Sequence, residues 1–108
     1  MSGKLELSAS PTLGDLQKYV QQMVKVRGFK DNRIEQRFLL LLEESGEFAK
    51  AVRKNAGLGF ADDTQKKDMA EEAADVFIIL LGICNMLNID LEQAFRDKEE
   101  KNKQRVWK

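Results

Sequence analysis

The amino-acid sequence predicts an all-α fold, with four helices arranged as a bundle. Hydrophobic residues recur at helical spacing along four segments, and no segment alternates with the period of two that is typical of a half-buried strand. The connections between the segments are short, as they are in helix bundles. The length of 108 residues suits one domain. We therefore expect a flexible tail at residues 1–11 and a single domain at residues 12–108.

The first helix is expected to begin after Thr12 and to end near Val26. Thr12 and Asp15 have the spacing of a capping box, in which each side chain accepts a hydrogen bond from the backbone N–H of the other residue. Gly28 follows the last apolar residue of the repeat, and glycine readily takes the left-handed conformation that ends many helices. These signals define both ends of the segment.

The second helix is expected to end near Asn55, because the glycine-rich segment 56–59 follows and breaks the helical pattern. Its start can be capped by Asp31 or Asn32, since both side chains readily accept a hydrogen bond from the first helical N–H groups. Apolar residues recur along this helix at the spacing of one face.

The third helix is expected to begin at Asp62 or Asp63 and to run to about Leu87. A short turn then starts at Asn88, and Asp90 is expected to cap the fourth helix. The fourth helix has a short apolar face and a strongly charged C-terminal end, so it is the most polar of the four.

The composition argues against several classes of function. Eighteen Lys and Arg residues balance 18 Asp and Glu residues, which argues against binding to a nucleic acid polymer. The N-terminal residues lack the apolar core of a secretory signal, and no apolar run approaches the roughly 20 residues of a membrane helix. We therefore expect a cytoplasmic protein without a membrane partner, in which the single cysteine, Cys84, is a buried thiol.

The apolar runs at residues 38–42 and 77–81 predict a homo-oligomer. Each run is apolar on all sides of its helix, and such a helix must be covered on all sides. A chain of 108 residues can scarcely cover two helices in this way. We expect a second copy of the chain to bury them.

Each apolar run has a pair of carboxylates beside it: one pair follows the run at residues 38–42, and the other precedes the run at residues 77–81. Glu44 and Glu47 are three residues apart, as are Glu72 and Asp75, so each pair shares one helix face. Small residues separate the members of each pair, Ser45 and Gly46 in one and Ala73 and Ala74 in the other, and these are expected to let the two helices approach closely. Converging carboxylates repel each other, by about 4 kcal/mol for two charges 4 Å apart at an effective dielectric constant near 20.

A divalent cation would relieve this repulsion. The chain contains no histidine, so a metal must be held by oxygen, which favours Mg²⁺ with Mn²⁺ as a possible substitute. Acidic clusters on helices are more often solvated faces, and a single ExxE or ExxD pattern is weak evidence for a metal. Two such pairs on adjacent core helices favour a metal site.

The order of these motifs resembles that of the MazG-like nucleotide pyrophosphohydrolases. The signature of that family is EExxE followed, some tens of residues later, by ExxD, and this chain has Glu43-Glu44-x-x-Glu47 and then Glu72-x-x-Asp75. The resemblance spans roughly residues 12–107. It implies an all-α fold in a homodimer or homotetramer, and hydrolysis of a nucleoside triphosphate to the monophosphate and pyrophosphate.

The resemblance also implies roles for particular residues. Glu44, Glu47, Glu72 and Asp75 match the metal ligands of the family. Glu43 and Glu71 match acidic positions that either position water or lie at the surface, and Glu43 is taken as a candidate catalytic residue. Attack by water requires a general base, for which Glu47 is our candidate.

Residues on the fourth helix match a further pattern of the family. Lys98, Asn102 and Arg105 share one helix face by their spacing, and the resemblance implies that this face contacts the polyphosphate. A solvated basic end of the helix is the alternative. Phe29 stands where relatives often have an aromatic residue, and it can stack on the nucleotide base.

The leading interpretation is a Mg²⁺-dependent hydrolase that removes non-standard or surplus nucleoside triphosphates, a house-cleaning role. One alternative is a di-metal bundle of redox type, against which the absence of histidine argues. The other is a non-enzymatic helical metal-binding or interaction protein, which would show no Mg²⁺-dependent turnover.

Overall fold

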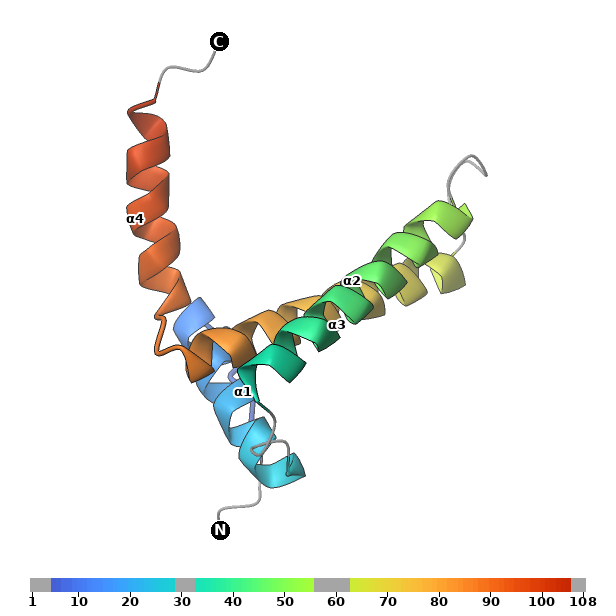
Figure 1. The fold of residues 1–108 in the computed structure, drawn as a ribbon, viewed down its shortest axis with the longest axis horizontal. Coiled ribbons are helices and arrows are strands. Elements are labelled where there is room, and N and C mark those ends of the chain that lie inside the picture. The colour runs from blue at the N-terminus through green and yellow to red at the C-terminus, as the bar shows by residue number, and fades with distance from the viewer. Residues whose placement is uncertain (1–4, 29–32, 56–62, 106–108) are drawn as a thin grey trace.

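Four α-helices make up the computed structural model, which describes residues 5–28, 33–55 and 63–105. They are α1 (Leu13–Arg27), α2 (Ile34–Asn55), α3 (Asp63–Met86) and α4 (Leu91–Lys103), as Figure 1 shows. No strand occurs within these three described ranges. The prediction of an all-α fold with four helices is therefore confirmed.

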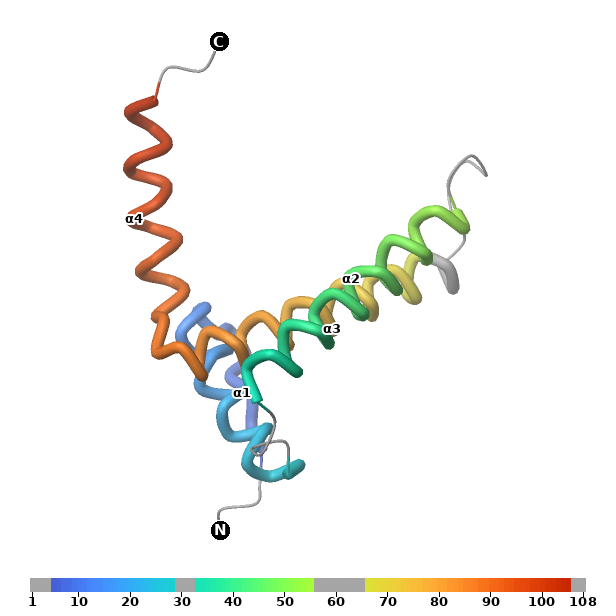
Figure 2. Tube along the Cα trace, in the orientation of Figure 1, coloured from blue at the N-terminus to red at the C-terminus, as the bar shows by residue number. Residues whose placement is uncertain are grey.

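The helices are arranged around a long antiparallel pair. Helices α2 and α3 lie side by side, and α1 crosses the end of the pair at which α2 begins and α3 ends (Figures 1 and 2). Helix α4 leaves the end of α3 at an angle of 97° and packs mainly against α1. A single chain is thus more open than a closed four-helix bundle.

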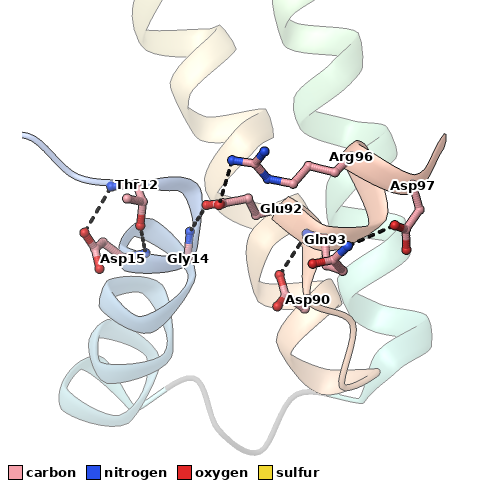
Figure 3. Close-up of polar contacts among 8 residues, drawn as sticks. All are labelled: Thr12, Gly14, Asp15, Asp90, Glu92, Gln93, Arg96 and Asp97. Atoms are coloured by element: carbon pink, nitrogen blue, oxygen red, sulfur yellow. Dashed lines mark hydrogen bonds and ion pairs between the residues drawn. The ribbon is translucent and has the colours of Figure 1, made fainter. Parts of the chain in front are cut away.

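The ends of α1 and α4 are held by the predicted caps. The N–H of Thr12 donates to the Asp15 carboxylate and the N–H of Asp15 donates to the Thr12 hydroxyl, both at 3.0 Å. Gly28 ends α1 with φ of 81°. Asp90 accepts from the N–H of Gln93 at 3.1 Å (Figure 3). These local signals are readable in the sequence because each involves residues three or four positions apart.

Helix α2 begins at Ile34. Arg33 occupies the N-cap position, because its carbonyl accepts from the N–H of Arg37 at 3.0 Å, and its own N–H donates to the Gln36 side chain at 2.9 Å. The expected caps, Asp31 and Asn32, lie outside the described residues, as does the predicted loop at 56–59. Helix α3 begins at Asp63, as predicted.

The core lies where α1 crosses the pair. Its buried centre consists of Val20, Met23 and Leu81. Leu5, which precedes α1, packs against this centre together with residues of α1, α3 and α4. Cys84 is buried, as predicted, and desolvation raises the pKa of its thiol.

A buried glutamine joins α1 to the junction of α3 and α4. The Gln17 side chain donates to Asn85 Oδ1 at 3.1 Å and to the Ile89 carbonyl at 2.9 Å. It also accepts from the N–H of Leu91 at 2.7 Å. Asn85 in turn donates to the Gln17 carbonyl at 2.9 Å. This network fixes the position of α1 through side chains that no local sequence signal reveals.

Large hydrophobic side chains remain exposed along α2 and α4. Leu39 is 66% exposed, Leu42 is 69% exposed and Phe95 is 66% exposed. Exposure of this kind on one molecule is typical of surfaces that pack against a partner. Within the described ranges, no single helix is long and apolar enough to cross a membrane. Helices α3 and α4 pass that test only together, by length and composition, across their 97° bend.

Candidate metal centre

Three of the four predicted metal ligands come together between α2 and α3. Glu44, Glu72 and Asp75 each offer a carboxylate oxygen, and these three oxygens lie within 4.8 Å of one another. Glu44 lies near the middle of α2, and the other two share a face of α3 because they are three residues apart. The antiparallel pairing of the two helices creates the cluster.

The cluster is electrostatically strained around Glu44. Partial desolvation raises the pKa of Glu44, and the negative charges of Asp75 and Glu72 raise it further, followed by those of Glu43 and Glu47. A raised pKa means that the charged carboxylate is disfavoured in the folded chain. A bound cation would favour the charged form instead.

The donor set fits a hard divalent cation. Mg²⁺ prefers carboxylate oxygens and commonly keeps several waters or substrate phosphate oxygens in its shell. Glu44 and Glu72 are half-buried, whereas Asp75 is exposed, so the cluster is open to solvent on one side. Three protein oxygens leave coordination positions for water and for a phosphate.

The remaining predicted acids lie beside this set. Glu47 does not belong to the three oxygens within 4.8 Å of one another, but it lines a groove together with Glu72. Glu43 is exposed and acts on Glu44 through its charge. Glu47 is exposed and shares this groove with one of the three clustered acids.

The groove beside the carboxylates carries two lysines that sequence reasoning missed. It has a volume of about 260 Å³ and runs from Glu47 and Glu72 toward the far end of the helix pair. Lys50 and Lys54 of α2 line it. The sequence could have indicated them, because Lys50 and Lys54 follow Glu47 by three and seven residues and so lie on the same helix face. Four carboxylates, those of Glu47, Asp68, Glu71 and Glu72, line the same groove, so its two lysines stand among acids.

The predicted substrate-binding residues of α4 are not beside the cluster of the same chain. Lys98, Asn102 and Arg105 lie in the C-terminal half of α4 and just beyond it, and α4 leads away from the α2–α3 pair (Figure 1). Their spacing gives a shared face but says nothing of the direction in which the helix points. Phe29 lies outside the described residues.

The expected role of Gly46 is wrong for the single chain. A Cβ atom added at Gly46 would have no neighbour within 4 Å, so its small size does not bring α3 closer. The side of α2 that carries Gly46 faces outward. Helix spacing predicts which residues share a face, but the sequence does not say which face meets the neighbouring helix.

Fold and site together define an all-helical protein with a carboxylate cluster between two antiparallel helices, next to a groove that carries lysines. Residues 33–107 match the MazG nucleotide pyrophosphohydrolase domain, and the chain belongs to that family. The chain is also similar to the uncharacterized protein YvdC of Bacillus subtilis (strain 168). The two are 29% identical over 96 residues, which cover 82% of this chain and 91% of that protein.

Proposed function

We propose that this protein is a Mg²⁺-dependent nucleotide pyrophosphohydrolase, which converts a (deoxy)nucleoside triphosphate and water to the monophosphate and pyrophosphate. The observation that carries the proposal is the convergence of Glu44, Glu72 and Asp75 in a member of the MazG family. Such a cluster provides oxygen ligands for Mg²⁺, with Mn²⁺ as a substitute. Membership of the MazG family is the reason for proposing a nucleotide as the substrate.

The chemistry assigns different tasks to the acids. When bound, Mg²⁺ neutralises charge that develops on the phosphate oxygens and makes a coordinated water more acidic. Glu44, Glu72 and Asp75 hold the cation, and Glu47 is proposed as a fourth ligand or as the general base. As a base, its carboxylate accepts the proton of the water that attacks the α-phosphorus. Glu43 adds negative charge nearby and can orient that water.

The leaving pyrophosphate needs positive charge along its path. Lys50 and Lys54 line the groove that starts at Glu47, so they are proposed to contact the β- and γ-phosphates. Lys98, Asn102 and Arg105 belong to the end of α4, which leads away from the cluster of their own chain (Figure 1). We propose that they reach the phosphates of a second copy in a homodimer or homotetramer. Cytoplasmic nucleotide house-cleaning is the proposed setting.

The experiment is an assay of products from a panel of canonical and modified triphosphates, with Mg²⁺ and with EDTA. We expect pyrophosphate and monophosphate in equal amounts, with Mg²⁺ only. Glu47→Gln should abolish turnover while the far-ultraviolet circular dichroism stays unchanged.

Glu35→Gln is the matched control. It makes the same change of charge at another exposed position of the same helix, and by helical periodicity Glu35 lies on the face of α2 opposite Glu44. Its ion pair with Arg33, 3.1 Å long, is a surface pair of small energetic value. If Glu47→Gln hydrolysed triphosphates at the wild-type rate, the assignment of Glu47 to the site would be wrong. If the wild type hydrolysed no triphosphate of the panel, the alternative of a non-enzymatic helical protein would remain.

A further inference from the structure

One side of α2 is left uncovered by the rest of the chain. Helix α2 packs lengthwise against α3, and α1 and α4 lie at one end of this pair (Figure 1). The large hydrophobic side chains that α2 leaves 45–69% exposed all lie on the uncovered side: Phe38, Leu39, Leu42 and Val52. By helical periodicity the middle of this side points away from Glu44, whose carboxylate meets the acids of α3.

Six exposed positions form one straight stripe along this side of α2. They follow one another by four and three residues in turn, which is the repeat of helices that pack lengthwise against each other. A Cβ atom added at the glycine in the middle would have no neighbour within 4 Å, so the stripe is open there. The six positions are Glu35, Leu39, Leu42, Gly46, Ala49 and Arg53.

A second, antiparallel copy of α2 fits this stripe by size. With a two-fold axis level with Glu44, Leu42 of each copy faces Gly46 of the other, because both lie two residues from the axis. Leu39 faces Ala49 in the same way, five residues from the axis. A large side chain thus lies opposite a small one in every apolar layer, which lets the two helices approach closely and bury the leucines.

The same register also pairs the charges at the two ends of the stripe. Glu35 and Arg53 lie nine residues from the axis on either side, so an acid of one copy faces a guanidinium of the other at both ends. Arg33 of the same chain donates to Oε2 of Glu35 at 3.1 Å, and Oε1 can accept from Arg53 of the other copy. Glu35→Gln keeps an oxygen acceptor there, so that variant leaves the interface in place.

These charges favour the antiparallel arrangement over a parallel one. In a parallel pair Glu35 would lie beside Glu35 and Arg53 beside Arg53, so both ends would repel. The antiparallel register also brings Phe38 of one copy beside Val52 of the other, on one flank of the stripe. On the other flank Glu43 comes near its own copy, at an exposed edge where water weakens the repulsion.

We propose that two copies of this chain pack through α2 as an antiparallel pair, with a two-fold axis level with Glu44. The inference rests on the homo-oligomer of the proposed function and names its contact surface, but it does not depend on the proposed reaction. Because Glu44 points away from the stripe, the carboxylate clusters of the two copies lie level with each other, on opposite sides of the α2 pair.

Disulfide cross-linking tests the direction and the register. Leu39→Cys and Ala49→Cys are combined in one chain, in which the two positions lie ten residues, or roughly 15 Å, apart along the helix. A disulfide needs Cα atoms within about 7 Å, so no bond forms within the chain. We expect a covalent dimer from the double variant under a mild oxidant, and none from either single variant. The single variants also control for Cys84, which is buried.

Charge reversal tests the pairing at the ends. Arg53→Glu places two acids together at both ends, which should raise the dissociation constant of the pair roughly tenfold at low salt. Combining it with Glu35→Arg reverses both partners and should restore assembly. Lys25→Glu, at an exposed position of α1, should leave assembly unchanged. Light scattering over a dilution series measures all four proteins.

The outcomes separate this inference from the proposed function. Neither measurement needs a substrate, so a protein that cross-links as expected but hydrolyses no triphosphate keeps the interface and loses the proposed reaction. Cross-linking of the single variants would mean a parallel pair. An oligomeric wild type whose double cysteine variant stays uncross-linked, or whose assembly ignores Arg53→Glu, would be held by another surface. Either result overturns the inference, as does a monomeric wild type.

Discussion

At the scale of single residues, the site depends on carboxylates that are unfavourable neighbours without a cation. The effect falls on Glu44, because desolvation and the charges of four surrounding acids raise its pKa. A folded-state pKa above the ordinary value means that the protonated form stabilises the fold and that this stability is lost as the pH rises through the raised pKa. At neutral pH the charged Glu44 therefore opposes folding of the metal-free protein.

This predicts an opposite effect of one substitution with and without metal. Glu44→Gln should raise the melting temperature of the metal-free protein at neutral pH, and the gain should shrink as the pH falls below the raised pKa. With Mg²⁺ at about 100 times its Kd, the wild type should gain about 2.7 kcal/mol, whereas the variant should gain much less. Thermal unfolding over a pH series measures both effects.

The titration of Glu44 also determines how the affinity for Mg²⁺ depends on pH. A proton on Glu44 competes with the cation, so the affinity for Mg²⁺ should fall as the pH is lowered through the raised pKa. Equal stabilisation of Glu44→Gln and wild type by Mg²⁺ would show that Glu44 is not a ligand.

At the scale of the helices, the buried network of Gln17 determines where α1 lies. Its side chain makes three hydrogen bonds, to Asn85, Ile89 and Leu91, across the turn between α3 and α4. Helix α1 contributes Val20, Met23 and Val24 to a cavity between α1, α2 and α3. A displaced α1 would therefore change this cavity as well as the core.

Replacement of the glutamine should cost stability. Gln17→Met keeps the size of the side chain but leaves buried donors and acceptors on α3 and α4 without partners, which should cost about 2–3 kcal/mol. Gln22→Met, at an exposed position of α1, should cost little. Urea unfolding at a fixed protein concentration compares them. An equal loss in both variants would mean that the network does not hold α1.

At the scale of the whole molecule, one chain is more open than a compact domain of its length, which supports the proposed homo-oligomer. Its radius of gyration is 16.7 Å, whereas a compact domain of about 100 residues has about 13 Å. Large apolar side chains on α2 face outward, with Leu39 and Leu42 about two-thirds exposed. A second copy packed on this face would cover them and would supply the α4 residues that the single chain directs elsewhere.

The interface is open to a direct test. The wild type should be a dimer or tetramer by light scattering, and Leu39→Glu should shift it toward monomer because a charge would be buried in the interface. Leu7→Glu, at an exposed leucine before α1, should leave the assembly unchanged. A monomeric wild type at micromolar concentration would contradict the proposed oligomer.

The sequence predicted what local spacing determines. The capping box at Thr12, the end of α1 at Gly28 and the cap at Asp90 are confirmed because each depends on residues a few positions apart. The convergence of Glu44 with Glu72 and Asp75 was also predictable, because two acidic pairs lie on two adjacent core helices.

The rest depends on tertiary packing. The direction of α4 depends on the 97° bend after α3, and the positions of Gln17 and Arg37 depend on where α1 crosses the pair. On a helical pattern, both polar residues read as surface positions. The spacing of Lys50 and Lys54 was readable in the sequence, but the groove that they line beside Glu47 forms only when α2 and α3 pack together.

The most direct test of the central claim follows the oxygen of the attacking water. The protein is incubated with Mg²⁺ and the triphosphate that it hydrolyses fastest in water enriched in ¹⁸O, and the products are analysed by mass spectrometry. Attack at the α-phosphorus predicts one labelled oxygen in the monophosphate and none in pyrophosphate, with no reaction in EDTA. Label in pyrophosphate or in free phosphate, or turnover that persists in EDTA, would contradict a metal-dependent pyrophosphohydrolase.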